Sequence, residues 1–381
     1  MNAVKPPHAR VVHVGNYLKP GCDGAAASLR GQVCALHSQG VDVSVWQFEV
    51  ALQQVTSSIS DTGLIVHRIP RFHNPLLAAV AVPAVSRSWI RCRLSEADFL
   101  HLHSVFTPQN IFSARLGLPY AVTPQGGWSK HVLRGHRAIM KSLWIAMFER
   151  SLWTNAAFVQ AVSVTECRDL RELPRVSRLT FIPNGVDLPP VFPRDTCRKP
   201  YFLFVGRLAV EQKGLDLLVN AYAAARRKQE HIPDLIIAGP DFRDGSVRLR
   251  RQISALGLAD KIRLSGPVSG ETKNSLLRNA LVFVHPSRWE GMPLSILEAL
   301  AHATPCIVTE PTGLGEWVAQ NNCGWRVAVS VEAIADKLVT AASQRSEVEE
   351  RSLNSRRAVG KDFAWKNIAS QLNARYQEAI S

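Results

Sequence analysis

Short apolar runs alternate with stretches of helical spacing along the whole chain, and this alternation restricts the possible folds more than any other feature. The runs that predict strands in the first half are Val11–Val14, Val41–Val45, Leu64–Ile69, Phe99–His103, Tyr120–Thr123, Phe158–Val162 and Leu179–Ile182. Those in the second half are Tyr201–Val205, Leu235–Ala238, Ile262–Leu264, Leu281–His285 and Cys306–Thr309. Strands separated by helices form parallel sheets with right-handed crossovers, so the pattern predicts a doubly wound α/β architecture.

The length of the chain and one proline-rich segment predict two domains. At 381 residues the chain exceeds what a single hydrophobic core usually organises. The segment Pro189–Pro193 is typical of an extended connector, because proline fixes φ and lacks an N–H to donate. We therefore expect one Rossmann-like domain over residues 1–190 and another over 191–360, facing each other across a cleft. Ligands of such sheets bind beyond the carboxyl ends of the strands.

Hydropathy and cysteine usage predict a cytoplasmic protein. The polar N-terminal segment has no apolar signal core. The most apolar stretch, Pro75 to Val85, is broken by Pro83 and is far shorter than the roughly 20 residues that a bilayer crossing needs. The seven cysteines are dispersed and include no C-x-x-C pair, which favours reduced thiols over a disulfide framework or a zinc site.

The positive charge of the chain predicts an anionic partner. The formal net charge is +14, and the excess of basic residues is greatest between Leu64 and Phe148. This stretch contains ten Lys and Arg residues but only two acids, and Trp89, Trp128 and Trp144 lie among them. Such a surface attracts nucleic acid, acidic lipid headgroups or a phosphate-bearing acceptor. The alternative is a solvated basic face without a partner.

The segment His285–Ala301 predicts an anion site at a helix entrance. Pro293 suits the first turn of a helix, where its missing N–H costs nothing. Gly291 and Met292 then lie at the helix entrance, where free N–H groups and the helix dipole attract a diphosphate.

Two glutamates flank this entrance. Glu298 lies about 8 Å up the helix, at ~1.5 Å per residue, within reach of the ribose of a nucleotide whose diphosphate rests on the entrance. Glu290 stays in the loop, on the other side of the diphosphate, where a sugar would be. The apolar residues of the helix suffice to pack it, so neither glutamate is needed for the fold. The alternative is a buried strand–loop–helix with two surface acids.

A second segment, Tyr201–Gly214, places two cations in a loop at the end of a strand. Arg207 follows Gly206, and Lys213 comes six positions later, before the next predicted helix. The segment lacks the Gly-Lys-Ser/Thr ending of a Walker loop. Arginine binds a diphosphate with two parallel hydrogen bonds and lysine acts as a point charge, so the pair suits a diphosphate leaving group.

These motifs resemble those of the family 4 retaining glycosyltransferases, which have the GT-B architecture of two Rossmann-like domains. The residues that carry the resemblance are the Glu290 and Glu298 pair, Val205–Leu208 with Lys213-Gly214, Ile182–Asp187, Ile237–Pro240 and Phe363–Trp365. The resemblance covers nearly the whole chain but is densest in the second domain. It implies an acceptor-binding first domain, a nucleotide-sugar-binding second domain, and a helix over residues 361–381 that crosses back to the first.

The resemblance also assigns roles to residues of the second domain. Glu290, Arg207 and Lys213 would be catalytic, with Glu290 stabilising positive charge on the sugar and the two cations holding the diphosphate. Glu298 would bind the ribose. The remaining donor contacts would come from Gly291, Met292, Pro293 and Leu294, from Gly24 of the first domain and, near the nucleobase, from Val268.

The first domain departs from the family pattern. Where many members have a Gly-Gly pair after the first strand, only Gly24 carries over. Many members place a histidine beside the transferred sugar, and Gln125 stands at that position; glutamine can hydrogen-bond a sugar hydroxyl but is no acid or base near neutral pH. His103 is a second candidate for a sugar or acceptor contact, or a structural residue.

The sequence thus predicts a transfer of sugar from a UDP- or GDP-sugar to a glycan or lipid-linked acceptor, in cell-surface polysaccharide or lipopolysaccharide synthesis. We expect no metal and no other cofactor, because no Asp-x-Asp motif is present. We also expect contact with an anionic membrane surface at the inner face of the plasma membrane, and no nucleic acid, because no recognition motif for it is found. The alternatives are a nucleotide-sugar epimerase or a phosphorylase of the same architecture, a non-catalytic sugar-nucleotide-binding subunit, and a nucleic-acid-binding protein.

Overall fold

The computed structural model describes residues 9–18, 24–129, 132–133, 138–173, 175–176, 178–191 and 199–381, and the chain divides into two compact units. Unit 1 comprises Met1–Gly185 and Trp365–Ser381, and unit 2 comprises Val186–Ala364. The sequence placed these boundaries at residues 190 and 360. The connector that it predicted lies partly outside the described residues, which omit 192–198.

Unit 1 is built on an eight-stranded sheet in the order β3-β4-β2-β1-β5-β6-β7-β8. Its strands are β1 (Arg10–Val14), β2 (Asp42–Glu49), β3 (Thr56–Ile59), β4 (Ile65–Pro70), β5 (Phe99–His103), β6 (Tyr120–Thr123), β7 (Phe158–Ala161) and β8 (Leu179–Phe181). All neighbours pair in parallel except β3, which pairs antiparallel with β4 at the sheet edge. Strand β3 was not predicted from the sequence, because its residues are exposed and carry no apolar alternation.

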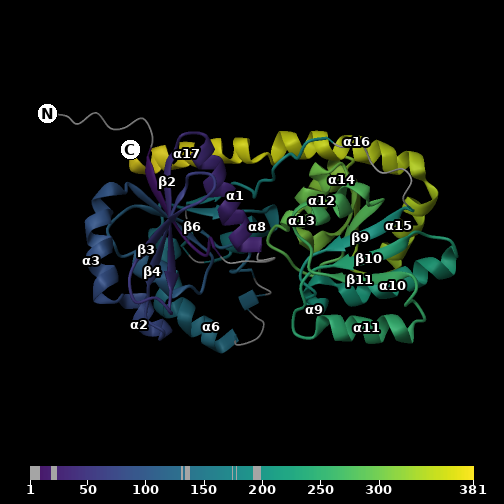
Figure 1. The fold of residues 1–381 in the computed structure, drawn as a ribbon, viewed down its shortest axis with the longest axis horizontal. Helices are drawn as coiled ribbons and strands as arrows, with labels where there is room; N and C mark the ends of the chain where they lie inside the picture. The colour runs from purple at the N-terminus through teal and green to yellow at the C-terminus, as the bar shows by residue number, and fades with distance from the viewer. Residues whose placement is uncertain are drawn as a thin grey trace. The chain divides into compact units, whose positions relative to one another are not determined.

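Helices cover both faces of this sheet (Figure 1). The helices of unit 1 are α1 (Gly24–Ser38), α2 (Pro75–Val80), α3 (Ala84–Arg93), η1 (Leu94–Glu96), α4 (Pro108–Ser113), α6 (Ala138–Trp144), the π-helical turn η2 (Ile145–Glu149), α7 (Arg150–Asn155), α8 (Val164–Arg171) and α17 (Trp365–Ile380). Alternate residues of the central strands, such as β1, enter two different cores. Val12 and Val14 pack with residues of α2, α4 and α7, whereas Val11 packs with α1 and α17. The last helix of the chain therefore completes the core of unit 1.

Unit 2 has a six-stranded parallel sheet in the order β11-β10-β9-β12-β13-β14. Its strands are β9 (Tyr201–Val205), β10 (Asp234–Ala238), β11 (Ile262–Gly266), β12 (Val282–His285), β13 (Cys306–Thr309) and β14 (Gly324–Val327). Counted within the unit, this order is 3-2-1-4-5-6, the arrangement of dinucleotide-binding folds. The strand order reverses between β9 and β12, and ligands of such sheets bind beyond the carboxyl ends of these two strands.

The helices of unit 2 pack an apolar core against this sheet. They are α9 (Val210–Lys213), α10 (Leu215–Lys228), α11 (Gly245–Ala255), α12 (Gly270–Asn279), α13 (Leu294–Ala301), η3 (Glu310–Thr312), α14 (Gly315–Gln320), α15 (Val331–Ser343) and α16 (Arg345–Asp362). Helix α10 contributes Leu218, Val219 and Tyr222 to the core, all fully buried. Among the described residues, every helix is too short or too polar to cross a lipid bilayer.

Candidate functional site

The loops that follow β9 and β12 bring Lys213 and Glu290 together. Lys213 ends α9, and Glu290 lies in the loop between β12 and α13. The Lys213 Nζ atom is 2.5 Å from Glu290 Oε1, and both side chains are largely buried. Two residues separated by 77 positions in the chain thus meet where the strand order of unit 2 reverses.

The Glu290 carboxylate is held by two more side chains. Ser287 Oγ donates to Glu290 Oε1 over 2.7 Å, and His285 Nε2 lies 3.3 Å from the same oxygen. Burial raises the pKa of Glu290, but the Lys213 ammonium and the hydrogen bond with His285 outweigh burial and lower that pKa to about 2. The carboxylate is therefore ionised at neutral pH. No described residue donates a hydrogen bond to Oε2, which leaves that oxygen for a ligand.

Backbone contacts fix the position of the Glu290 loop on α9. Gly214 has φ +63°, and a Cβ atom at this position would lie 2.0 Å from the Pro286 carbonyl oxygen. Arg288 adds a two-pronged ion pair with Asp216, at 2.8 and 2.7 Å, and its backbone N–H donates to the Gln212 carbonyl. The glycine permits the close approach, and the ion pair maintains it.

Arg207 lies beside the same strand end but outside the Lys213–Glu290 pair. Its guanidinium carbon is 5.0 Å from the centre of the Phe242 ring, a cation–π contact. The preceding Gly206 packs against Gly239, where a Cβ atom would lie 1.8 Å from the Gly206 carbonyl oxygen. The Arg207 side chain forms no hydrogen bond or ion pair with any described residue, so its guanidinium donors are available to an anion.

The entrance of α13 differs by one residue from the prediction. Pro293 is the N-cap, with φ −74° and ψ 114°, and the first helical residue is Leu294. Extended backbone at Pro293 places the start of the helix after the proline instead of at it. Gly291 is half-buried, and Met292 and Pro293 are buried. The first N–H groups of a helix have no intrahelical acceptor and can bind an anion.

Glu298 is engaged by a lysine that the sequence analysis did not single out. Lys273 Nζ, from α12, lies 2.7 Å from Glu298 Oε1, and both side chains are partly exposed. Ile296 and Leu297 of the same helix are fully buried, so the apolar face packs α13 and Glu298 faces away from the core. Val268 is half-buried in the loop after β11.

In unit 1 the side chain of Gln125 is tied to two neighbours. Gln125 has φ +54°, and its Nε2 donates to Ser28 Oγ over 2.8 Å, while its Oε1 accepts a 3.4 Å bond from Asn184 Nδ2. Ser28 belongs to α1, which begins at the exposed Gly24 with open space around that residue. The side-chain amide of Gln125 is therefore held in a fixed position beside helix α1.

A buried carboxylate supports the Gln125 loop. Glu166 accepts hydrogen bonds from the Gly126 N–H, at 2.5 Å, and the Val162 N–H, at 2.7 Å. Burial raises the pKa of Glu166 to about 7 despite these two donors. The loop geometry at Gln125 thus depends on a side chain 41 positions further along the chain.

His103 belongs to a buried group with His13 and His101, in which one ring nitrogen from each histidine lies within 4.8 Å of the other two. Three histidines at such distances are able to bind a metal ion. In this structure His13 Nδ1 and His103 Nε2 are 2.9 Å apart and share a hydrogen bond, and both His101 nitrogens bond to the hydroxyls of Tyr376 and Thr123. His13 Nε2 and His103 Nδ1 have no described partner. A metal bound by all three histidines would therefore have to replace one of the two His101 hydrogen bonds.

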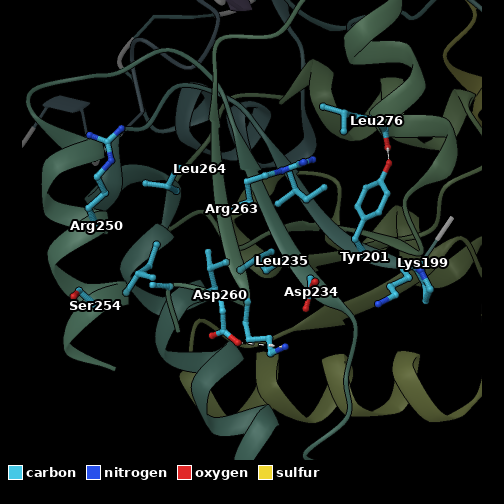
Figure 2. Close-up of a pocket in the computed structure, with 16 residues that line it drawn as sticks. Lys199, Tyr201, Asp234, Leu235, Arg250, Ser254, Asp260, Arg263, Leu264 and Leu276 are labelled. Carbon is cyan, nitrogen blue, oxygen red and sulfur yellow. Dashed lines mark hydrogen bonds and ion pairs between the residues drawn. The ribbon is translucent and has the colours of Figure 1, made fainter. Parts of the chain in front are cut away.

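One hollow in unit 2 lies away from these strand ends. Figure 2 shows its residues, among them Lys199, Tyr201, Asp234 and Arg250. Its volume is about 760 Å³. Tyr201 and Asp234 are the first residues of β9 and β10, so the hollow opens near the amino ends of these strands. The Lys213–Glu290 pair follows the opposite, carboxyl ends.

Several side chains at the site were not singled out from the sequence. His285 and Ser287 stand within the segment that was recognised, three to five residues before Glu290, so their proximity was detectable. Lys273 and the Arg288–Asp216 pair carry no local signal, because they depend on which face of a helix meets which loop. Of the basic residues between Leu64 and Phe148, Lys130, Arg134 and Arg137 lie outside the described residues.

Comparisons with solved structures agree with this fold. Sucrose-phosphate synthase from Thermosynechococcus elongatus matches 97% of this chain and 98% of its own, with a TM-score of 0.77 and 17% identity. HepE from Anabaena, solved in complex with UDP and glucose, matches 97% and 100%, with a TM-score of 0.73 and 15% identity. Both are glycosyltransferases of the GT-B architecture, which this chain shares.

Comparisons of sequence identify the family. The GDP-mannose:cellobiosyl-diphosphopolyprenol alpha-mannosyltransferase of Xanthomonas oryzae pv. oryzae is 27% identical over 292 residues, which cover 75% of this chain and 76% of that protein. The family model for the glycosyl transferase 4-like domain matches residues 23–185, and the model for glycosyl transferases group 1 matches residues 195–358. Together the two models span most of both units, and the chain belongs to the group 1 glycosyl transferases with a glycosyl transferase 4-like first domain.

Proposed function

We propose that this glycosyltransferase moves a sugar from a nucleoside-diphosphate donor to a glycan or lipid-linked acceptor, with retention of configuration. The observation that carries the proposal is the Lys213–Glu290 pair at the point where the strand order of unit 2 reverses, beside Arg207 and the entrance of α13. A diphosphate needs positive charge and N–H donors, and this position supplies both.

Each residue has a distinct task in the proposed reaction. Arg207, Lys213 and the first N–H groups of α13 neutralise the departing diphosphate. As the bond between the anomeric carbon and phosphate oxygen breaks, Glu290 stabilises positive charge on the sugar through Oε2. The acceptor hydroxyl attacks on the same face, and its proton passes to the departing phosphate. Because the chain's own cations carry the charge, we propose that the reaction needs no metal.

We expect the donor and the acceptor to be bound by different parts of the chain. Glu298 would accept the ribose hydroxyls, with Lys273 yielding its place to them. In unit 1, the loop that carries Gln125 would contact the acceptor. The similarity to GDP-mannose:cellobiosyl-diphosphopolyprenol alpha-mannosyltransferase makes GDP-mannose and a polyprenyl-diphosphate-linked acceptor the first pair to test, within surface polysaccharide synthesis.

Substitution of the charged pair tests the proposal. Glu290→Gln keeps an acceptor for the Ser287 hydroxyl but removes the charge, and Lys213→Ala removes the cation. Each variant should lower turnover by about two orders of magnitude or more. Matched controls are Glu310→Gln and Lys228→Ala, whose side chains form exposed ion pairs elsewhere in unit 2.

The measurement is mass spectrometry of products from a panel of nucleotide sugars with a membrane extract, with circular dichroism as the check on folding. Turnover close to wild type in both site variants would remove the assignment. Conversion of the donor sugar without any acceptor would instead identify an epimerase.

A further inference from the structure

Three residues other than glycine have a left-handed backbone in two loops of unit 1. Ser104 and Phe106, in the loop after β5, have φ +66° and +54°, and Gln125, in the loop after β6, has φ +54°. We call residues 104–107 and 124–128 the paired loops. A left-handed backbone is costly for a side chain as bulky as phenylalanine, and it persists only where the surrounding structure holds it. Because such strain is concentrated at functional sites, the paired loops are candidates for one.

The sheet of unit 1 places the paired loops where ligands of this type of fold bind. The strand order reverses between β1 and β5, and β6 is the next strand. Ligands bind beyond the carboxyl ends of the strands at such a point. The two loops touch there: the Ser104 N–H donates to the Thr123 carbonyl over 2.9 Å, and a Cβ atom at Gly127 would lie 2.1 Å from Val105 Cγ2. The paired loops therefore form one packed surface.

The carboxylate of Glu149 joins the two loops to each other and to a helix. Glu149 is fully buried at the end of the π-helical turn η2, a rare conformation that is frequent at functional sites. Its Oε1 accepts hydrogen bonds from the Phe106 N–H, at 2.7 Å, and from the indole N–H of Trp144 in α6, at 3.1 Å. Its Oε2 accepts from the indole N–H of Trp128, at 3.2 Å. One side chain thus connects the loop after β5, the loop after β6 and helix α6.

The hydrogen bonds of Glu149 require a carboxylate and not only a polar side chain of that size. All three partners are N–H donors, and an ionised carboxylate offers acceptors on both oxygens. A glutamine in its place has one oxygen, so its NH₂ group would face an N–H donor. Burial raises the pKa of Glu149 to about 7, although the three donors favour the charged form. Above that pH the ionised side chain accepts all three bonds.

We propose that Glu149 is a positioning residue for the acceptor, because it holds the paired loops in the strained arrangement that presents Gln125. The inference rests on the proposed function, in which the Gln125 loop contacts the acceptor. Glu149 is fully buried and therefore acts through Phe106 and Trp128, without touching the substrate itself. Loss of its charge should weaken acceptor binding and leave the nucleotide site of unit 2 unchanged.

Steady-state kinetics of Glu149→Gln test this role. The donor is the nucleotide sugar that the product panel identifies, and the acceptor is a dilution series of extracted membrane lipids. The KM for the acceptor should rise about tenfold or more, with kcat nearly unchanged and with wild-type binding of nucleoside diphosphate in calorimetry. The matched control is Asp98→Asn, because the Asp98 carboxylate also accepts three hydrogen bonds, all from Arg10, but at the amino end of β5. Equal KM values in the variant and the control would overturn the proposal.

A double-mutant cycle tests whether Glu149 acts through the second loop. Trp128→Phe removes the indole donor and keeps an aromatic ring beside Trp153. This variant should also raise the KM for the acceptor, and its combination with Glu149→Gln should raise it little further, because both changes break the same hydrogen bond. Fully additive effects would show that the two residues act independently and would contradict the proposed role.

Nuclear magnetic resonance of the wild type tests the shared carboxylate without substrate and without a variant that has to fold. The indole N–H resonances of Trp128 and Trp144 should shift together with a midpoint near pH 7, because both groups donate to Glu149. Separate midpoints, or no shift, would overturn the positioning role. Absence of transfer by the wild type with every acceptor would instead contradict the proposed function, and the two indole resonances would still report how the loops are held.

Discussion

The carboxylates of Glu290 and Glu298 in unit 2 have different partners, which indicates that they have different roles at the site. Glu290 is largely buried and shared among Lys213, Ser287 and His285, whereas Glu298 is partly exposed and bonded to Lys273. An exposed ion pair contributes little to stability, typically 0–1 kcal/mol. Glu298 can therefore exchange its lysine for a ligand hydroxyl at small cost.

Discrimination between ribose and deoxyribose measures the role of Glu298. The wild type should bind nucleoside diphosphate about tenfold to a hundredfold more tightly than the corresponding 2′- or 3′-deoxynucleotide, because the hydrogen bond between the missing hydroxyl and the charged carboxylate is lost. Glu298→Ala should bind both nucleotides weakly and equally. Calorimetric titration of the four combinations gives the result. Undiminished discrimination in Glu298→Ala would assign the ribose contact to another residue, and Glu316→Ala, which changes an exposed residue of α14, is the control.

At the scale of elements, a loop and a helix share one close contact. Gly214 joins α9 to α10 with a left-handed backbone, and the Pro286 carbonyl occupies the space where a side chain would begin. The contact links the Lys213 turn to the Glu290 loop. The separation of the two catalytic candidates is therefore set by backbone packing and not by their ion pair alone.

Alanine substitution at two glycines distinguishes the cost of a left-handed backbone from the cost of a steric clash with neighbouring backbone. Gly257 has φ +65°, nearly the value at Gly214, but a Cβ atom there meets nothing within 4 Å. Gly257→Ala should cost only the left-handed conformation, about 1–2 kcal/mol. Gly214→Ala adds a clash with backbone and should lower the free energy of unfolding by about 3 kcal/mol or more, with loss of activity. Urea unfolding of both variants provides the comparison, and equal losses would contradict the argument.

The sequence predicted the buried strands better than the side-chain contacts of the candidate site. Strands with buried apolar runs, such as β9 and β12, were found, because burial on both faces leaves a continuous signal. The exposed β3 and the short β14 were missed for lack of that signal. Lys213 and Glu290 were each expected at the donor site because both follow strand ends, but their direct ion pair was not predicted. Contacts such as Gln125 with Ser28 and Asn184 join distant segments and have no signature along the chain.

At the scale of the whole molecule, buried ionisable groups in unit 1 oppose one another as the pH changes. Burial lowers the pKa of His103 to about 3 and lowers the pKa values of His13 and His101 well below their usual range, with a smaller contribution from the neighbouring rings to the latter two. Burial raises the pKa values of Glu149 and Glu166 to about 7. The histidines are thus neutral in the folded protein, and the two acids gain protons on folding near pH 6.

The sign of each contribution follows from proton binding. Between about pH 3 and 6.5 the unfolded chain binds more protons at His103 than the folded protein does, so stability rises with pH. Between about pH 4.5 and 7 the folded protein binds more protons at Glu166, so stability falls as pH rises. In the window where the two overlap the contributions cancel in part. Below about pH 4.5 the acids no longer contribute, and stability should fall steeply.

Two substitutions in unit 1 should change the slope of stability against pH in opposite directions. Between about pH 4.5 and 6.5, His103→Gln should lower the slope by up to about 1.4 kcal/mol per pH unit, because it removes a proton that only the unfolded chain binds. Glu166→Gln should raise the slope by a similar amount, because it removes a proton that only the folded protein binds. The slope reports the proton balance even where the substitution also shifts the stability itself. Hydrogen exchange of the amides of β1 and β5, corrected for the intrinsic effect of pH, gives the opening free energy of this sheet. Slopes that shift in the same direction in both variants would show that these buried groups do not control the acid stability of unit 1.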